Sequence, residues 1–363
     1  MVSIFWVLSG ISLSLKPIQL ARGQAWDKFF DTMFSSVFRR MLRLYLPVLA
    51  VQVCVLIATC LGMYNHAYAL SKDWPFAGGN ETQHVVKESN LAQIADWAKV
   101  MWALANPFNP TRPVYDVHLW TIPFEFRNSI ILFATLVGFA KLKSKIRVIL
   151  TSALWAYCVL VNEGDVALFI AGMGLAEYLL IRDEHAKQLP SADTTPETKR
   201  TQDRKTLAIW SFVCFVGLWL LSWPSWNNEH SPGYMTLYHL TPPFIYSAEM
   251  TWSRIGAAVF LLALCGCETL CKPFKTPVAI YMGKISFPLY IVHGPLNHII
   301  GIRLVEFFWS IVGNTSLFAY ETGVVFAFLT EAVMVVWLAD IVMRTVDTPS
   351  VRFGRWLQTR WSM

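Results

Sequence analysis

Three arginines in the sequence Arg39-Arg40-x-x-Arg43 lie just before a long apolar run. On an α-helix, where each residue advances by about 100°, these positions fall within about a quarter turn or so of one face. Guanidinium forks match phosphate oxygens, so such a face could hold a phosphorylated cofactor. Basic residues at the end of a membrane helix also act as plain topology anchors, and the pattern alone favours that interpretation.

The segment from His118 to Arg127 brings a second set of charges to the start of an apolar run. Thr121 is predicted to cap this helix, with Glu125 one turn further on, where the helix dipole favours a carboxylate. Charged groups at membrane depth are usually functional. The sequence therefore leaves two interpretations of equal weight, a chemical site that includes His118 and Glu125, or a structural anchor.

A polar stripe forms the third candidate. Ser286, Tyr290, His293 and Asn297 are spaced by 4, 3 and 4 residues, so they share one face of an otherwise apolar helix. A single histidine in such a helix usually makes one interhelical hydrogen bond. A whole polar face is better explained by a cavity, and the prolines nearby predict kinks that free backbone carbonyls.

The elements that must position these residues are membrane helices. The chain has 363 residues, of which 55% are hydrophobic and 15% charged, and its mean hydropathy is +0.43. These values exclude a soluble, disordered or collagen-like chain and predict an all-α polytopic membrane helix bundle. Nine apolar runs are predicted to span the bilayer: 1–15, 44–62, 121–140, 146–161, 166–181, 206–222, 255–267, 285–302 and 321–343.

The net charge of +6 does not indicate nucleic acid, because the basic residues lie between apolar runs rather than on one patch. Most of the 30 Lys and Arg residues fall in alternate loops and in the tail, which predicts a cytoplasmic C-terminus and places the loop 63–120 outside. The glycosylation sequons at Asn80 and Asn314 both fall in loops on the outside. Together these signals predict a multi-pass protein of the secretory-pathway or plasma membrane.

The predicted domain organisation is one transmembrane domain over residues 1–344 and a cytoplasmic tail over 345–363. Nine spans that end inside require an outside N-terminus, and the sequence begins within an apolar run without a charged flank. This is the pattern expected of a chain that lacks its first helix. The seven cysteines suggest neither a disulfide framework nor a metal site.

Four motifs resemble those of the acyltransferase-3 family, the integral membrane acyl-CoA O-acyltransferases, in the form found in filamentous fungi. They occur in the family's order between Met1 and about His298. The motifs are Phe5-Trp6-Val7-Leu8-Ser9-Gly10, Arg39-Arg40-x-x-Arg43-x-x-x-Pro47, His118-Leu-Trp120-Thr121-Ile-Pro-Phe-Glu125 and Ile285-Ser286-Phe-Pro-Leu-Tyr290-Ile-Val-His293-Gly294-Pro295.

The resemblance implies a ten-helix bundle that transfers an acyl group, often acetyl, from acyl-CoA to a hydroxyl of a carbohydrate, lipid or small metabolite. Acyl-CoA would be a co-substrate, with no permanently bound cofactor. The residues that match the motifs would then have three roles. Arg39, Arg40 and Arg43 would bind CoA phosphates, Glu125, His118 and His293 are the catalytic candidates, and Trp120, Ser286, Tyr290 and Asn297 would line the substrate cavity.

In one respect the sequence departs from the family. The family's first helix carries an Arg and, eleven residues later, a His regarded as the general base, and this sequence has neither. We therefore expect either an acyltransferase whose activity is in question, or a non-catalytic paralogue or gene-model fragment. The alternative from another class is a solute transporter, which proline-broken helices and Glu331 within a span would suit. The sequence leaves the acceptor and the oligomeric state open.

Overall fold

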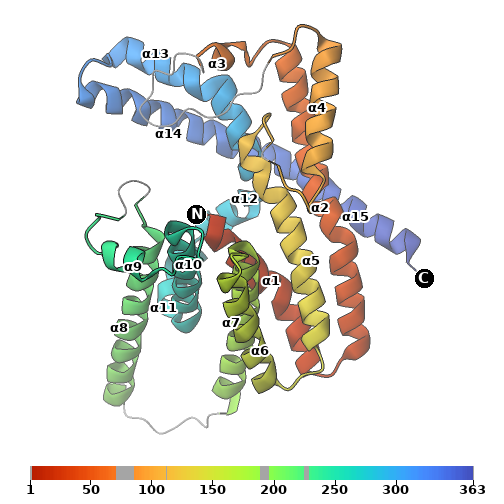
Figure 1. Ribbon diagram of the computed structural model, residues 1–363, viewed down its shortest axis with the longest axis vertical. Coiled ribbons are helices and arrows are strands. Elements are labelled where there is room, and N and C mark those ends of the chain that lie inside the picture. The colour runs from red at the N-terminus through yellow and green to blue at the C-terminus, as the bar shows by residue number, and fades with distance from the viewer. Residues whose placement is uncertain (1, 71–85, 112, 189–195, 225–228, 363) are drawn as a thin grey trace. The chain divides into compact units, whose positions relative to one another are not determined.

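The computed structural model describes residues 2–70, 86–111, 113–188, 196–224 and 229–362, and all regular structure in them is helical (Figure 1). This confirms the all-α prediction. The α-helices are α1 (Val2–Arg22), α2 (Trp26–Cys60), α3 (Asn65–Leu70), α4 (Asn90–Leu104), α5 (Thr121–Phe139), α6 (Ser144–Leu160), α7 (Gly164–Gln188), α8 (Pro196–Leu221), α9 (Met235–Leu240), α10 (Ala248–Gly266), α11 (Glu268–Cys271), α12 (Pro277–Leu296), α13 (Ile302–Val312), α14 (Leu317–Val342) and α15 (Thr348–Trp361). The 3₁₀ turns are η1 (Val117–Trp120) and η2 (Lys272–Lys275), and the π turns are η3 (Asn297–Gly301) and η4 (Met343–Asp347).

Within these residues, seven helical segments are long and apolar enough to cross a membrane: Val2–Arg22, Trp26–Cys60, Val117–Phe139, Gly164–His185, Arg204–Leu221, Ala248–Gly266 and Leu317–Trp361. Each coincides with a predicted span. The other two predicted spans, 146–161 and 285–302, are also helical but are not among the seven. The protein is therefore a multi-pass helical membrane protein.

Three segments predicted to lie outside the spans are nonetheless helical. Residues 26–43 form the first half of α2, the outside loop contains α4, and the predicted tail forms η4 and α15, which continue α14 without a break. The stretch 183–205, which lies between two predicted spans, also contains the end of α7 and the start of α8. Hydropathy marks the apolar part of a helix but not its polar extension into water, which explains the shorter predictions.

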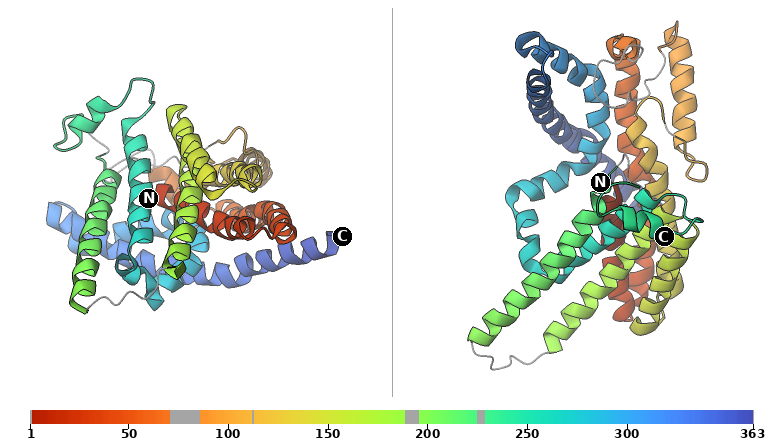
Figure 2. Two further views of the ribbon diagram at one scale, coloured as in Figure 1. Left: turned by 90° about the horizontal axis from the view of Figure 1, so that it is seen from below. Right: turned by 60° about the vertical axis from the view of Figure 1, so that its left-hand side comes forward.

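The chain divides into two units, each described by itself. Unit 1 comprises residues 1–35 and 128–276, and unit 2 comprises residues 36–127 and 277–363. In unit 1, α1, α6 and α7 lie side by side, as do α8 and α10 (Figure 1, Figure 2).

In unit 1, Gly10 of α1 packs closely against Gly172 of α7. A Cβ added to Gly172 would lie 2.7 Å from both the Gly10 Cα and the Ile11 N atom. Gly217 of α8 and Gly256 of α10 form a similar close contact, since a Cβ on Gly256 would lie 2.9 Å from the Gly217 carbonyl oxygen. Small residues let membrane helices pack backbone to backbone, and this packing holds unit 1 together.

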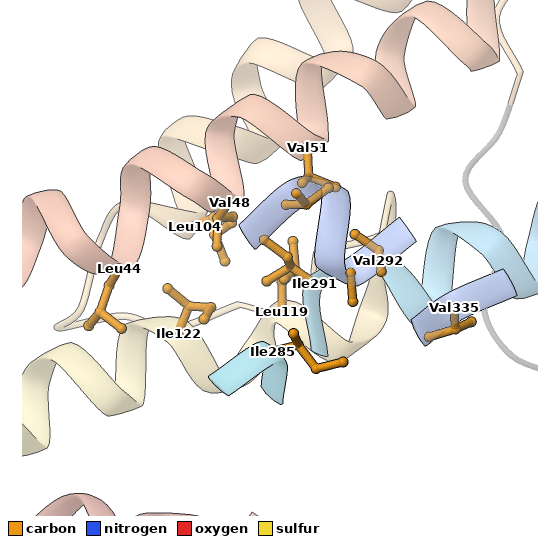
Figure 3. Close-up of a cluster of buried hydrophobic side chains, with 12 residues drawn as sticks. Leu44, Val48, Val51, Leu104, Leu119, Ile122, Ile285, Ile291, Val292 and Val335 are labelled. Atoms are coloured by element: carbon orange, nitrogen blue, oxygen red, sulfur yellow. The ribbon is translucent and has the colours of Figure 1, made fainter. Parts of the chain in front are cut away.

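In unit 2 an apolar cluster gathers side chains from α2, α4, η1, α5, α12 and α14 (Figure 3). Its most buried members include Leu119, Ile285 and Ile291, each with no exposed surface. Leu119 lies in η1 and both isoleucines lie in α12, so the cluster packs these two elements around the candidate site residues that they carry.

The helix α12 does not continue regularly into α13. Pro288 and Pro295 lie inside it, and the π turn η3 follows Pro295 directly. Proline lacks the N–H that an α-helix needs, so each proline removes one hydrogen bond to the turn before it. The predicted kinks stay a prediction, and the irregularity that the structure shows is the π turn. After α13, Gly313 adopts a left-handed φ of 81° and Ser316 caps α14, which turns the chain back on itself.

Candidate active site

A buried ion pair joins α2 to α5 in unit 2. Arg40 Nη2 lies 2.5 Å from Glu125 Oε1, and the two residues are 9% and 3% exposed. Charges removed from water are tolerated in such a position when they are paired, and removal of one partner leaves the other charge uncompensated. The structure thus brings together a predicted cofactor-binding residue and a predicted catalytic residue that lie 85 positions apart.

The other two arginines of the motif lie in different environments. Arg39 is half-buried and Arg43 is exposed, and the charge of Arg43 acts on both Arg39 and Arg40. The face that the sequence predicts as one cationic surface is therefore divided. Arg40 points inward to a carboxylate, whereas Arg43 stays at the surface of unit 2.

The imidazole of His118 is oriented by a buried carboxylate. Asp116 caps the 3₁₀ turn η1, and its Oδ1 atom accepts a hydrogen bond from the His118 backbone N–H at 3.1 Å. The same oxygen lies 3.2 Å from His118 Nδ1, and the side chain of Asp116 has no exposed surface. When Nδ1 donates its proton to this carboxylate, Nε2 carries the lone pair and can accept a proton.

A second histidine lies against the first. The ring centroids of His118 and His293 are 4.4 Å apart, and His293 Nδ1 lies 2.6 Å from the Tyr290 carbonyl oxygen. Because a carbonyl can only accept, Nδ1 of His293 is the donor, which leaves its Nε2 as the acceptor in the neutral ring. The two imidazoles thus form a pair held by Asp116 on one side and by the backbone of α12 on the other.

The hydroxyl of Tyr290 connects α12 to η1 and α5. It donates a hydrogen bond to the His118 carbonyl oxygen and lies 2.5 Å from the Thr121 hydroxyl. Since the proton of Tyr290 goes to the carbonyl, the Thr121 hydroxyl is the donor in the second bond. This small network fixes the position of His118 relative to α12.

The prediction that Thr121 caps the helix is wrong. The helical turn starts earlier, at Val117, and Asp116 is the residue that caps it. Thr121 is the first residue of α5, directly after this 3₁₀ turn, and its hydroxyl bonds to Tyr290 instead. A short 3₁₀ turn before an α-helix is common, and its aspartate cap replaces the predicted one.

Gly294 permits the close approach of α12 to this site. A Cβ added there would lie 2.8 Å from Asp116 Oδ1 and 2.9 Å from His118 Nδ1, closer than real Cβ atoms come to other heavy atoms. Any side chain at this position would displace the carboxylate or the imidazole. The glycine is therefore required for the geometry of the histidine pair.

The sequence of this chain matches a known protein family. The sequence profile of a family described as an acyltransferase domain matches residues 1–342. The chain belongs to the acyltransferase-3 family. It is 29% identical to the O-acetyltransferase PaAT-1 of Phomopsis amygdali over 99% of this chain and 74% of that protein. It is 26% identical to the acyltransferase clz18 of Cochliobolus lunatus, over 96% of this chain and 78% of that protein. No solved structure matches the chain.

The remaining predicted cavity residues of this acyltransferase take different positions. Trp120 is half-buried and packs edge-on against Phe124 with ring centroids 5.6 Å apart. Ser286 is exposed and bonds to the Gly283 carbonyl of its own helix. Asn297 is the first residue of the π turn η3, and its Oδ1 atom lies beside Gly301. The structure therefore brings Tyr290 and His293 of the predicted stripe to His118, but it does not bring Ser286 there.

Of the two predicted glycosylation sites, the structure describes one. Asn314 is exposed in the turn between α13 and α14, where a glycosyltransferase could reach it if the turn faces the lumen. Asn80 lies outside the described residues.

Two residues of the site escaped the sequence prediction. Asp116 was missed although it stands two positions before His118, a spacing that lets a carboxylate bond both the backbone and the ring of a histidine. Gly294 was quoted only as part of a motif, and nothing local shows that another element packs against it.

Unit 1 contains a polar cluster that the sequence did not reveal. Glu177 of α7 accepts hydrogen bonds from Arg147 Nε at 2.8 Å and Nη2 at 2.9 Å, from Arg22 Nη1 at 2.6 Å, and from Ser144. Arg147 and Glu177 are 3% and 2% exposed. Both carboxylate oxygens are used, so this cluster ties α1, α6 and α7 together.

A metal site was also sought among the side chains of the described residues. Among the described residues, no group of three or more His, Cys, Asp or Glu side chains is arranged to hold a metal ion. The chemical groups available to the acyltransferase there are the histidine pair with Asp116, the Arg40–Glu125 pair and the exposed arginines.

Proposed function

We propose that the protein transfers an acyl group from acyl-CoA to a hydroxyl of a carbohydrate, lipid or small metabolite. Family membership supports acyl transfer, and the relative named an O-acetyltransferase supports acetyl as the group and oxygen as its acceptor. The same membership favours this function over the solute-transporter alternative.

The donor would be held through its phosphates. Arg43 is exposed at the surface of unit 2 and Arg39, four positions earlier, is half-buried. Guanidinium groups match phosphate oxygens in charge and shape. Arg40 differs because its charge is already compensated by Glu125. In this proposal the Arg40–Glu125 pair holds α2 against α5. It thereby positions the phosphate-binding arginines, which lie on α2.

The observation that carries the chemical part of the proposal is the Asp116–His118–His293 arrangement. His118 Nε2 would remove the proton from the acceptor hydroxyl as its oxygen attacks the thioester carbonyl carbon. The carbon–sulfur bond then breaks, and the proton passes from His118 to the departing CoA thiolate. Asp116 keeps the imidazole in the required tautomer, the role that a carboxylate has beside a catalytic histidine.

His293 would face the acceptor. Its Nδ1 proton is committed to the Tyr290 carbonyl, so Nε2 can accept a hydrogen bond from a hydroxyl-bearing substrate. His118 then receives the proton of the acceptor hydroxyl. This division of roles predicts that His293 contributes more to acceptor binding than to the rate of the chemical step.

For the location we propose a multi-pass protein of the secretory-pathway or plasma membrane, with the C-terminus in the cytoplasm. The charge distribution and the two sequons support this orientation. The transmembrane domain would comprise residues 1–344. The segment 345–363 would be cytoplasmic, in the helical form of η4 and α15.

The test uses the purified protein in neutral-lipid nanodiscs with acetyl-CoA and a panel of hydroxyl-bearing acceptors. Release of the CoA thiol is measured for the wild type, for His118→Ala and for the control His185→Ala, whose histidine is exposed on α7. We expect His118→Ala to lower transfer by about a hundredfold or more, with the control within about twofold. A wild-type rate in His118→Ala contradicts the assignment of the base. Binding of CoA without any transfer would favour the non-catalytic paralogue.

A further inference from the structure

The C-terminal helix α15 packs against the arginine-bearing part of α2 in unit 2. Gly354 is buried, and a Cβ added to it would lie 3.8 Å from Leu42 Cδ1 and 3.9 Å from Arg39 Cγ. One further contact lies nearby, where the rings of Phe38 and Trp361 meet edge-on with centroids 6.4 Å apart. The contact therefore involves the stem of Arg39 itself.

This packing brings a third arginine to the surface that Arg39 and Arg43 form. Arg355 follows Gly354 directly, and the charges of both Arg355 and Arg43 act on Arg39. Arg39 and Arg43 are four residues apart on one helix, so they are already neighbours. The carboxylate of Asp347 lies near Arg43 and offsets part of this charge.

Like charges held close together repel, and an anion bound among these arginines would relieve their mutual repulsion. Arg43 and Arg355 are both exposed, so their guanidinium groups can reach a ligand in solution.

We propose that Arg355 of α15 completes, with Arg39 and Arg43, a binding site for the phosphate groups at the nucleotide end of CoA. The inference rests on the proposed function and adds a residue outside the matched family region, which ends at residue 342. A ribose 3′-phosphate carries about two negative charges at neutral pH, and the diphosphate of CoA adds more. Three guanidinium groups suit such a ligand better than one arginine pair.

A phosphate of an anionic lipid offers the same chemistry as a phosphate of CoA. The experiment therefore uses two lipid compositions. The full-length protein is placed in nanodiscs of phosphatidylcholine alone, or of phosphatidylcholine with phosphatidylserine. Binding of CoA and of adenosine 3′,5′-bisphosphate, which lacks the pantetheine arm and the thiol, is then measured by calorimetry.

We compare Arg355→Ala, Arg355→Lys and the matched control Arg360→Ala, whose arginine is exposed on the same helix. In neutral-lipid discs we expect Arg355→Ala to weaken the binding of both ligands by about tenfold or more. Arg355→Lys should recover part of this loss, and Arg360→Ala should stay within about twofold of the wild type. Equal elution volumes in size-exclusion chromatography show that the variants are folded.

The outcomes separate this inference from the proposed function. If the wild type binds CoA, Arg43→Ala weakens binding and Arg355→Ala does not, the C-terminal helix takes no part and this inference is wrong. If Arg355→Ala changes only the response to phosphatidylserine, Arg355 binds lipid phosphate rather than CoA. That result would also overturn this inference. If the wild type binds neither ligand, the proposed use of CoA fails as well.

Discussion

Glu177 in unit 1 and Glu125 in unit 2 are both buried carboxylates that pair with arginine, yet their surroundings differ. Glu177 accepts hydrogen bonds on both oxygens from two arginines and a serine, so its charge is compensated within a closed cluster. Glu125 pairs with Arg40 in a region where further arginines remain exposed. A closed cluster is suited to hold helices together, whereas an excess of positive charge is suited to bind an anion.

Helix packing within each unit shows a similar difference between structural and chemical contacts. In unit 1, α1 and α7 meet at Gly10 and Gly172, with backbone against backbone. In unit 2, α12 approaches η1 at Gly294, but the space that this glycine leaves is occupied by the carboxylate of Asp116 and the ring of His118. Small residues bring helices together in both units, and at Gly294 of unit 2 the approach brings a carboxylate and an imidazole together.

The largest predicted effect on stability concerns Glu177→Ala. The change leaves Arg147 buried without its carboxylate partner, so we expect a loss of about 3–5 kcal/mol in the free energy of unfolding. Denaturant-induced unfolding in detergent would measure it. The matched control is Glu184→Ala, which removes the exposed partner of Arg22 and should cost about 1 kcal/mol or less. Equal losses in the two variants would show that the cluster does not hold unit 1.

The comparison predicts a different result for the charge-removing substitution Glu125→Gln. It should lower acyl transfer per folded molecule, because Arg40 loses the charge that positions α2 against α5. Glu177→Gln should instead lower the amount of folded protein and leave the rate per folded molecule within about twofold of the wild type. Transfer rates normalised to the folded peak in size-exclusion chromatography distinguish the two, and equal rates would remove the distinction between the units.

An intermediate effect is expected for Gly172→Ala. The new Cβ would lie 2.7 Å from the Gly10 Cα atom, and overpacking of this kind costs about 1–3 kcal/mol. Gly174→Ala is the control on the same helix, since the nearest atom to its Cβ, Cγ2 of Thr151, is 3.8 Å away. Thermal unfolding of both variants in the same detergent measures the difference. Alanine raises helix propensity at both positions, so a Gly174→Ala variant as destabilised as Gly172→Ala would show that the close contact with Gly10 is not the cause.

A smaller effect is expected from the hydroxyl network of unit 2. Tyr290→Phe removes the bonds to the His118 carbonyl and to Thr121, and Thr121→Val removes the second of these. A double-mutant cycle should give a coupling energy of about 1 kcal/mol. Tyr290→Phe should also slow acyl transfer more than Thr121→Val does. A coupling near zero would mean that the two hydroxyls act independently.

The smallest effect on stability is expected at the Asn314 sequon in unit 2. Glycosylation of Asn314 in a native membrane should give a band that shifts on treatment with an endoglycosidase. Asn314→Gln should remove this shift with a stability change of about 0.5 kcal/mol or less, since the residue is exposed. Modification by a cytoplasmic labelling reagent at position 314 would contradict the proposed orientation.

The amino-acid sequence by itself determined the helical membrane class, the positions of the apolar helices and the family. These properties depend on hydropathy and on short motifs, which are local in the chain. It also placed Tyr290 and His293 on one helix face, because helical spacing decides that without any other element. The capping residue was mispredicted because two local solutions, Asp116 with a 3₁₀ turn or Thr121 without one, were both compatible with the pattern.

Only the tertiary structure decided which charged residue meets which. Arg40 pairs with Glu125, and His118 contacts His293, across 85 and 175 positions of sequence. Glu177 pairs with Arg147 and Arg22, which lie on two other helices. Arg39 packs against α15 at Gly354. Hydropathy shows that a helix is apolar but does not specify which helix it packs against. Glycine contacts and the need to pair every buried charge select the partner helices, and both become visible only when the helices are packed.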